Sequence, residues 1–445
     1  MLNIITQFSK YLLVILTAVY AMKCFTVFRA KYDFDRGSVY MVQNVLMFLI
    51  HFIFYLLIYL NTKDMKVIVF YFLQVVLFVC TLVFYGVMYR RASRLIINNM
   101  CFLLMIGFVE LSRLDSADYP VSRQFMIAVV AIVISLAVPV IIEKGAFLKK
   151  IGPVYGVLGI IMIISVFIPG VGKNLNGATG WISVGPVSLQ PSELAKIVFV
   201  FFIAAMLCRR TDFKYIVIIS ACAAIHVLIL VAAKDLGAAL IFFTVYVIML
   251  YIATGKLRYL GLGFGGLAAA AAVAYRLFAH VRVRVQAWRY PWSDYQASTY
   301  QIAQSLFAIS TGGWFGTGFY KGMPEITPIA GSDFIFTAIV EEMGALFGIC
   351  LLLIYISCLM MFFNISLKIT DSFYKLLAMG LSAAYGVQVL LCVGGVVKFI
   401  PHTGVTLPLI SYGGSSILST ILVFSVIQGL YLLKQREVHG DVKVQ

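Results

Sequence analysis

The sequence has few charged residues, and acidic ones are the scarcest. Only 12% of its 445 residues are Asp, Glu, Lys or Arg, and Asp and Glu together number 18. A soluble globular chain is about a quarter charged, so this scarcity excludes a soluble enzyme, a disordered chain and a nucleic-acid binder. The sequence also lacks a Walker A motif, an HExxH motif and a CxxC pair, and no metal site is predicted from it.

What the sequence has instead is apolar residues, which make up 62% of the chain. Because roughly 20 apolar residues span a bilayer core, the repeated apolar runs predict an all-α polytopic membrane protein. Thirteen spans are expected, with twelve as an alternative. Their approximate ranges are 10–28, 38–60, 66–88, 97–112, 122–142, 150–169, 192–208, 213–232, 237–254, 258–278, 333–360, 375–397 and 407–432.

The net charge of +16 predicts the orientation of these spans. Lys and Arg concentrate in the short cytoplasmic loops of membrane proteins. The cation-rich short segments form one alternating set: 29–36, 90–94, 144–150, 209–214, 256–258, 368–375 and the C-terminal tail. This set is therefore expected in the cytoplasm, which puts the N-terminus and the two long loops, about 170–191 and 279–332, outside.

Three regions are expected along the chain. Residues 1–94 hold additional N-terminal transmembrane helices with almost no charge inside the spans. Residues 95–434 form a core whose spans and outer loops carry the prolines, glycines and ionisable groups. Residues 435–445 are a cytoplasmic tail. Because ionisable groups at membrane depth are costly, the core is where function is expected.

Two short segments of the core combine charge with a helix start. In the segment from Gln190, Pro191 suits a first helical turn, and Glu193 and Lys196 share one helix face and can neutralise each other. They form either a structural ion pair or an anion- or sugar-facing edge at the outer surface. Asp235 precedes another span, where it either caps the helix or lines a polar cavity.

The outer loop 279–332 carries clustered arginines with interleaved aromatics. Arg282 and Arg284 precede Trp288 and Trp292. Arginine binds phosphate with paired donors, and aromatic faces stack on sugars. An ordinary interfacial aromatic belt with solvated arginines explains the same pattern, and periodicity does not separate the two interpretations.

Asp333 and the segment 400–416 complete the candidate residues. Asp333 is expected in the first turn of a span near headgroup depth, as a general base or as an N-cap. The segment 400–416 interrupts an apolar stretch with two prolines and with Gly404, as broken helices do around membrane-embedded sites.

Together these segments resemble the SEDS family, the FtsW/RodA-type peptidoglycan glycosyltransferases. The matching motifs, in the family's order, are NGATGWISVG…QPSELAK (176–196), KDLGAAL (234–240), YQIAQSLFAISTGGWFGTGFYKG (300–322), DFIFTAIVEEMG (333–344) and IPHTGVTLPLISYGGSS (400–416). The resemblance implies a core of roughly ten helices in the bacterial cytoplasmic membrane. It implies polymerisation of lipid II into glycan strands at the outer face, for cell division or for cell shape and elongation.

The resemblance also implies roles for single residues. Asp333 matches the family's essential aspartate and is the expected catalytic base. The expected substrate-binding residues are Trp181, Gln190, Glu193, Lys196, Asp235, Arg282, Arg284, Gln304 and Ser411. We expect Arg282, Arg284 and Lys196 to stabilise a departing diphosphate. Where the family commonly has arginine before the tryptophan, this chain has Thr179 and Gly180, and Lys234 replaces the usual proline and partly restores the charge.

The implied partners are lipid II with its lipid-linked nascent glycan, a class B penicillin-binding protein that crosslinks the strands, and other membrane proteins of the divisome or elongasome. No nucleic-acid partner is expected. No cofactor is certain, and a divalent cation, Mg²⁺ or Mn²⁺, is left open. The alternative function is a lipid II flippase that uses the same polar cavity, although no inverted repeat supports it.

Overall fold

The computed structural model describes residues 2–29, 33–116, 118–175, 178–184, 187–294 and 299–438. Within these ranges, eleven helices are long and apolar enough to cross a membrane. Two shorter helices, α7 and α8, pack against each other between them. The predicted all-α polytopic architecture is confirmed. The tail beyond residue 438 lies outside the described residues.

The elements follow the apolar runs closely. The helices up to the first long loop are α1 (Leu2–Arg29), α2 (Asp33–Thr62), α3 (Met65–Met88), α4 (Arg94–Arg113), α5 (Val121–Ser135), α6 (Val138–Lys144), α7 (Gly152–Ile164) and η1 (Ser165–Phe167). The helices of the second part are α8 (Pro191–Leu207), α9 (Phe213–Ala232), α10 (Leu236–Thr254), α11 (Leu257–Leu277), α12 (Ala279–Arg289), α13 (Tyr300–Gly312), η2 (Pro324–Ile326), α14 (Ile335–Met343), α15 (Ala345–Lys368), α16 (Ser372–Val396) and α17 (Gly414–Val438).

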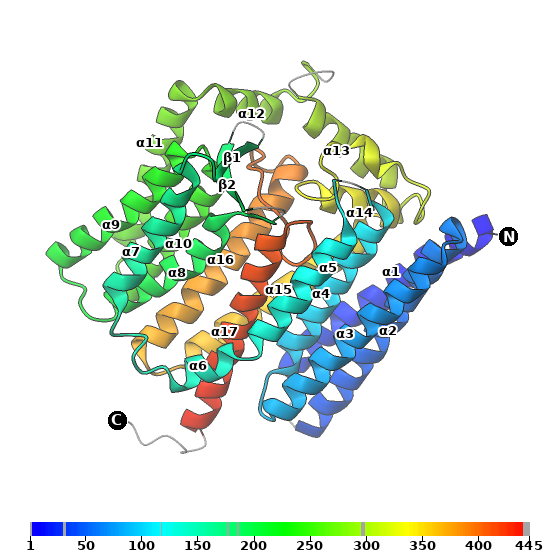
Figure 1. The fold of residues 1–445 in the computed structure, drawn as a ribbon, viewed down its shortest axis with the longest axis horizontal. Coiled ribbons are helices and arrows are strands. Elements are labelled where there is room, and N and C mark those ends of the chain that lie inside the picture. Colours follow the sequence, from blue (N-terminus) through cyan, green and yellow to red (C-terminus); the bar gives the residue numbers. More distant parts are fainter. Residues whose placement is uncertain are drawn as a thin grey trace.

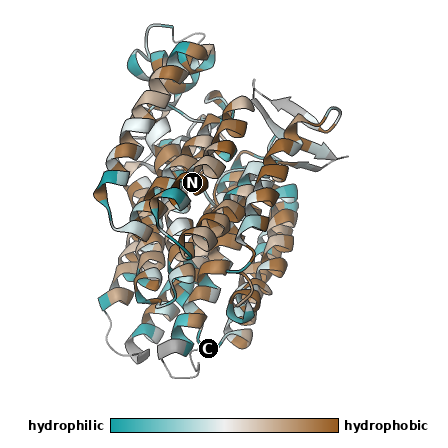
Figure 2. Cartoon of the chain, turned by 90° about the vertical axis from the view of Figure 1, so that its left-hand side faces the viewer, coloured by the Kyte–Doolittle hydropathy of each residue, from teal (hydrophilic) through white to brown (hydrophobic). Residues whose placement is uncertain are grey.

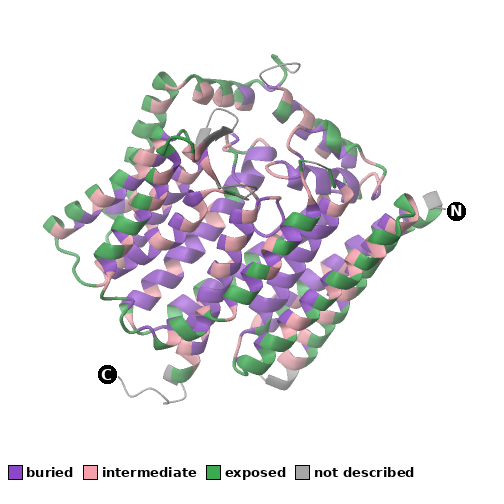
Figure 3. Cartoon of the chain, viewed as in Figure 1, coloured by how far each residue is buried: buried purple, intermediate pink, exposed green. Residues whose placement is uncertain are grey.

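The bundle has a buried centre and lipid-facing flanks. Helices α4, α16 and α17 are almost wholly buried, whereas α3 and α11 bury little of their surface. Figure 3 shows this as a purple interior with green edges at both sides. Apolar residues dominate the middle of the bundle, and hydrophilic residues gather toward its two ends (Figure 2). This distribution is what a bilayer around the molecule requires.

The N-terminus lies on the same side of the bundle as the long loops, and the C-terminal end of α17 lies on the opposite side (Figure 1). Near the start of α1, Gln7 Nε2 donates to the Thr317 carbonyl at 3.3 Å, and Lys10 Nζ donates to the Gly316 carbonyl at 3.0 Å. These contacts place the N-terminus beside the long loop that follows α12, as predicted.

A cluster of polar side chains within the bundle connects α1 to α4 and α15. Asn99 on α4 accepts a hydrogen bond from Tyr20 at 3.1 Å and donates one to Ser357 on α15 at 2.8 Å. Cys24 donates to the same Asn99 oxygen at 3.2 Å. Unsatisfied polar groups are costly in hydrocarbon, so these hydrogen bonds fix the position of α1 relative to α4 and α15.

The outer loops are more structured than expected. The loop before α8 folds into a three-stranded antiparallel sheet in the order β1-β2-β3: β1 (Gly172–Leu175), β2 (Ala178–Val184) and β3 (Val187–Leu189). The expected span 333–360 is two helices, because Gly344 takes a left-handed φ of 87° between α14 and α15. The chain from 401 to 413 is irregular, and α17 begins only at Gly414.

Candidate active site at the outer face

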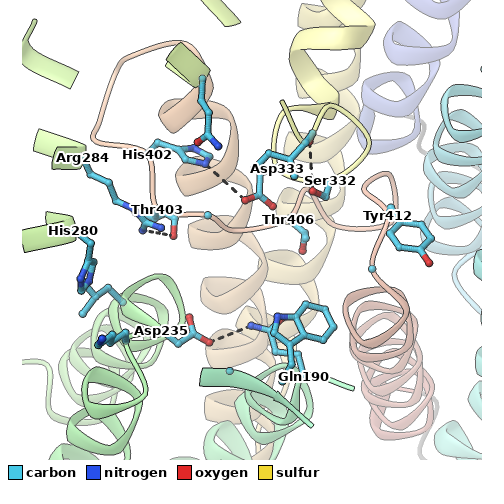
Figure 4. Close-up of a pocket in the computed structure, with 18 of the residues that line it drawn as sticks. Gln190, Asp235, His280, Arg284, Ser332, Asp333, His402, Thr403, Thr406 and Tyr412 are labelled. Atoms are coloured by element: carbon cyan, nitrogen blue, oxygen red, sulfur yellow. Dashed lines mark hydrogen bonds and ion pairs between the residues drawn. The ribbon is translucent and has the colours of Figure 1, made fainter. Parts of the chain in front are cut away.

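A cavity of about 670 Å³ lies at the outer end of the bundle. Its walls come from β2, α12, the turn before α14 and the irregular segment 402–414. The polar side chains that line it are Tyr119, Arg123, Trp181, Ser188, Gln190, Lys234, Asp235, His280, Arg284, Gln301, Ser332, Asp333, His402, Thr403, Thr406 and Tyr412. Figure 4 shows several of them converging from elements far apart in sequence.

Asp333 lies in the turn immediately before α14, and the helix begins at Ile335. The expectation that it occupies the first helical turn is therefore wrong by two residues. The turn is held by the segment before α17: Ser411 Oγ donates to the Ser332 carbonyl at 2.6 Å, and the Tyr412 amide donates to the Gly331 carbonyl at 2.8 Å. These bonds fix the backbone on which Asp333 projects into the cavity.

His402 is the nearest ionisable group to Asp333. Its Nε2 lies 3.8 Å from Asp333 Oδ2, and the histidine ring packs against Phe334 with centroids 4.6 Å apart. His402 Nδ1 is buried, and no hydrogen-bond partner for it exists among the described residues. The Asp333 side chain is 19% exposed and that of His402 9%, so water screens this pair weakly.

Arg284 approaches Asp333 from α12, on the opposite side of Gly404. Its Nη1 donates to the Thr403 carbonyl at 3.0 Å (Figure 4). A methyl group placed on Gly404 would lie 3.5 Å from both Arg284 Nη2 and Asp333 Oδ2. Burial lowers the pKa of Arg284 from its usual value, and the negative charges of Asp333 and Asp235 oppose that shift.

Asp235 forms the opposite wall of the cavity and caps α10. Its Oδ1 accepts from the Ala238 amide at 3.0 Å, and its Oδ2 accepts from Gln190 Nε2 and Ser192 Oγ, each at 3.1 Å. Burial raises the pKa of Asp235 above its usual value, and these hydrogen bonds oppose the shift. The two interpretations of Asp235, helix cap and cavity lining, are both correct.

The cavity carries more positive than negative fixed charge. Arg123, Lys234 and Arg284 line it together with only two carboxylates, Asp235 and Asp333. Burial lowers the pKa of His280, and the nearby Arg284 and Lys234 lower it further. The cavity is therefore suited to an anionic group beside a carboxylate that can accept a proton.

Glu193 and Lys196 lie beside the main cavity. They line a smaller adjoining space of about 30 Å³, which shares Gln190 and Asp235 with the large one. Lys196 Nζ lies 3.0 Å from Glu193 Oε2 and also donates to Gln388, and Ser419 Oγ donates to Glu193 at 2.7 Å. The predicted mutual neutralisation is confirmed.

Among the proposed substrate contacts, Trp181, Gln190, Asp235 and Arg284 line the main cavity with Asp333.

Three other proposed contacts do not line it. Arg282 is exposed on α12 and donates to the Arg276 carbonyl at 2.8 Å. Gln304 is half-buried on α13, and Ser411 is buried behind Ser332.

Several lining residues were not singled out from the sequence, above all His402, Thr403 and Tyr412. His402 belongs to the segment 400–416 that the sequence marks as interrupted, so an ionisable residue type in that segment is the available indication. Tyr119 and Arg123 carry no such indication, because they lie at the start of an apparently ordinary span.

The family model described as "Cell cycle protein", FTSW_RODA_SPOVE, matches residues 93–435. The peptidoglycan glycosyltransferase RodA of Mycobacterium tuberculosis (strain ATCC 25618 / H37Rv) is 34% identical, over 72% of this chain and 74% of that protein. The probable peptidoglycan glycosyltransferase FtsW of Geobacter sp. (strain M18) is 32% identical, over 60% of this chain and 74% of its own length.

Solved structures also resemble this chain. A chain from a peptidoglycan synthase complex, described as coordinating polymerization and crosslinking, aligns with a TM-score of 0.64 at 25% identity, over 78% of this chain and 98% of that one. The rod shape determining protein RodA of Thermus thermophilus aligns with a TM-score of 0.58 at 22% identity, over 78% and 97%. Helices α1–α3 lie outside the residues that the family model matches.

Proposed function

Because this chain belongs to the FtsW/RodA/SpoVE family of multi-pass bacterial membrane proteins, we propose that its outer cavity is the active site of a peptidoglycan glycosyltransferase. The enzyme polymerises lipid II into glycan strands at the outer face of the cytoplasmic membrane. One observation carries the assignment of the site: Asp333 and Arg284 flank Gly404 in a cavity with excess positive charge.

Asp333 acts as the general base in this proposal. It takes the proton of the acceptor sugar hydroxyl as that oxygen attacks the anomeric carbon of the lipid-linked donor. The new glycosidic bond forms, the bond between the anomeric carbon and the diphosphate oxygen breaks, and the electron pair leaves with the lipid diphosphate. A direct displacement of this kind inverts the configuration at the anomeric carbon. A positioned base contributes about 10²–10⁴-fold to such a step.

Arg284 and Lys234 stabilise the negative charge that grows on the leaving diphosphate. Fixed cations in a partly dehydrated cavity act more strongly than in water and need no rearrangement during the reaction. Lys196, expected from the sequence to share this role, is already paired with Glu193. It therefore supports the wall through its contact with Gln388.

His402 positions the carboxylate of Asp333, because its Nε2 lies 3.8 Å from Asp333 Oδ2. The ring is held by Phe334, which follows Asp333 in sequence, so the two side chains keep their relative geometry.

We also propose that a divalent cation can bind in the cavity, where few protein side chains are available to coordinate it. The described residues contain no group of three His, Cys, Asp or Glu side chains placed to hold a metal ion. Asp235 already accepts three hydrogen bonds, which leaves Asp333 as the available carboxylate. Mg²⁺ characteristically uses one or two carboxylates together with substrate phosphates, so Asp333 and the lipid diphosphate would hold it between them.

A crosslinking partner fits the same assignment. The complex that resembles this chain couples polymerization to crosslinking. We propose a class B penicillin-binding protein as the transpeptidase partner, with other divisome or elongasome proteins around the pair. Co-purification of the full-length protein with candidate transpeptidases tests this directly, and failure of every candidate to co-purify contradicts the proposal.

The activity is tested with purified protein in liposomes that contain labelled lipid II. A glycosyltransferase produces glycan polymer that lysozyme digests. The alternative, a lipid II flippase, moves label across the bilayer without polymer, and a non-catalytic scaffold does neither. Polymer that depends on Asp333 supports the proposal, whereas flipped lipid without polymer overturns it.

A further inference from the structure

A second cavity, of about 220 Å³, lies between α2, α3 and α4. It is at the arginine-rich end of these helices, opposite the active site, which the distribution of cations places at the cytoplasmic surface. Arg90 and Arg94 line its mouth. Both are exposed, and no ion-pair or hydrogen-bond partner for either guanidinium exists among the described residues.

The lining combines charged, polar and apolar side chains. Asn98 is about one helical turn further into α4 than Arg94, and Leu82 and Val83 lie five to six residues before the end of α3. A phospholipid presents the same kinds of groups: phosphate, glycerol esters and acyl chain.

Charge determines which class of lipid the cavity suits. The two arginines attract the phosphate and repel a head group that also carries an ammonium.

We propose that this cavity binds an anionic phospholipid from the cytoplasmic leaflet. The phosphate lies at Arg90 and Arg94, and the first acyl segment packs on Leu82 and Val83. Because the cavity lies in the additional N-terminal helices and their seam with α4, the proposal is independent of the glycosyltransferase assignment.

Gly86 offers a charge-neutral way to test the cavity itself. It lines the space, and a methyl group built on it meets no atom within 4 Å. Gly86→Leu therefore fills the cavity while leaving both arginines in place. The charge variant is R90Q/R94Q. Its matched control is R210Q/K214Q, which removes two exposed cations at the cytoplasmic junction of α8 and α9 that line none of the three cavities.

The experiment is native mass spectrometry of the full-length protein with phosphatidylglycerol or phosphatidylcholine of identical acyl chains. Each basic residue near a membrane surface contributes about fivefold to anionic-lipid affinity, so R90Q/R94Q is expected to lose about 30-fold. G86L should also lose the bound lipid, R210Q/K214Q should keep it, and phosphatidylcholine should not replace it.

Four results would overturn the proposal. Equal loss in the control pair would indicate a general surface potential, and unchanged binding in G86L would mean that the lipid does not occupy the cavity. If the protein retained phosphatidylcholine as well as phosphatidylglycerol, the charge of the head group would not determine binding. Displacement of the lipid by millimolar inorganic phosphate would indicate a soluble-anion site instead.

Discussion

Arg284 and Arg282 lie two residues apart on α12, and we expect only the removal of Arg284 to slow polymerisation. Arg284 lines the cavity beside Asp333, whereas Arg282 is exposed and bonds to the Arg276 carbonyl. A unit charge 4 Å from a developing anion is worth about 4 kcal/mol at the effective dielectric near a protein surface. R284Q should therefore slow polymerisation about 10²–10³-fold, the range seen when one transition-state donor is removed.

R282Q is the matched control, because it removes the same charge from the same helix. It should leave the rate within about twofold, as surface substitutions commonly do. R284K should be intermediate, since lysine keeps the charge but not the paired donors. The assay is the initial rate of lysozyme-sensitive glycan formation in liposomes at saturating lipid II. Equal losses in R284Q and R282Q would refute the electrostatic role given to Arg284.

Three further predictions concern the same region. H402Q should lower the rate of polymerisation, because the ring that packs on Phe334 and positions the Asp333 carboxylate is lost; a wild-type rate contradicts the positioning role. G404A should lower polymerisation while the protein remains folded, since alanine is strained at the φ of 74° of Gly404, and its methyl would lie in the space between Arg284 and Asp333; a wild-type rate argues against this. E193Q should cost about 3–5 kcal/mol of unfolding free energy by leaving Lys196 buried without its partner. Chemical denaturation in detergent measures this change in unfolding free energy, and the double variant E193Q/K196M should recover part of the loss.

The membrane-spanning framework was predictable because the bilayer imposes it. Apolar runs of about 20 residues leave few alternatives to spanning helices. The helix ends were less predictable: α14 ends where Gly344 turns left-handed, and no apolar pattern marks that break. The strands β1–β3 were missed because each has only three to seven residues in a polar outer loop.

The site was predictable to the extent that its residues are unusual for a membrane chain. Asp333, Asp235 and Gln190 stand out for their position, and the structure brings them to one cavity. The sequence does not show which of Arg282 and Arg284 faces the cavity, because both are arginines in the same basic cluster. On a helix they point about 200° apart, so only the docking of α12 determines which faces Asp333. His402 likewise becomes significant only once the segment before α17 folds over the cavity.

Polymerisation by D333N tests the central claim most directly. Asn keeps the size of the side chain and loses the ability to take a proton, so folding and lipid II binding should persist. Purified D333N in liposomes with labelled lipid II is expected to form no glycan polymer while retaining bound lipid II and the wild-type unfolding transition. Glycan polymer formed at the wild-type rate would contradict the assignment of Asp333 as the base.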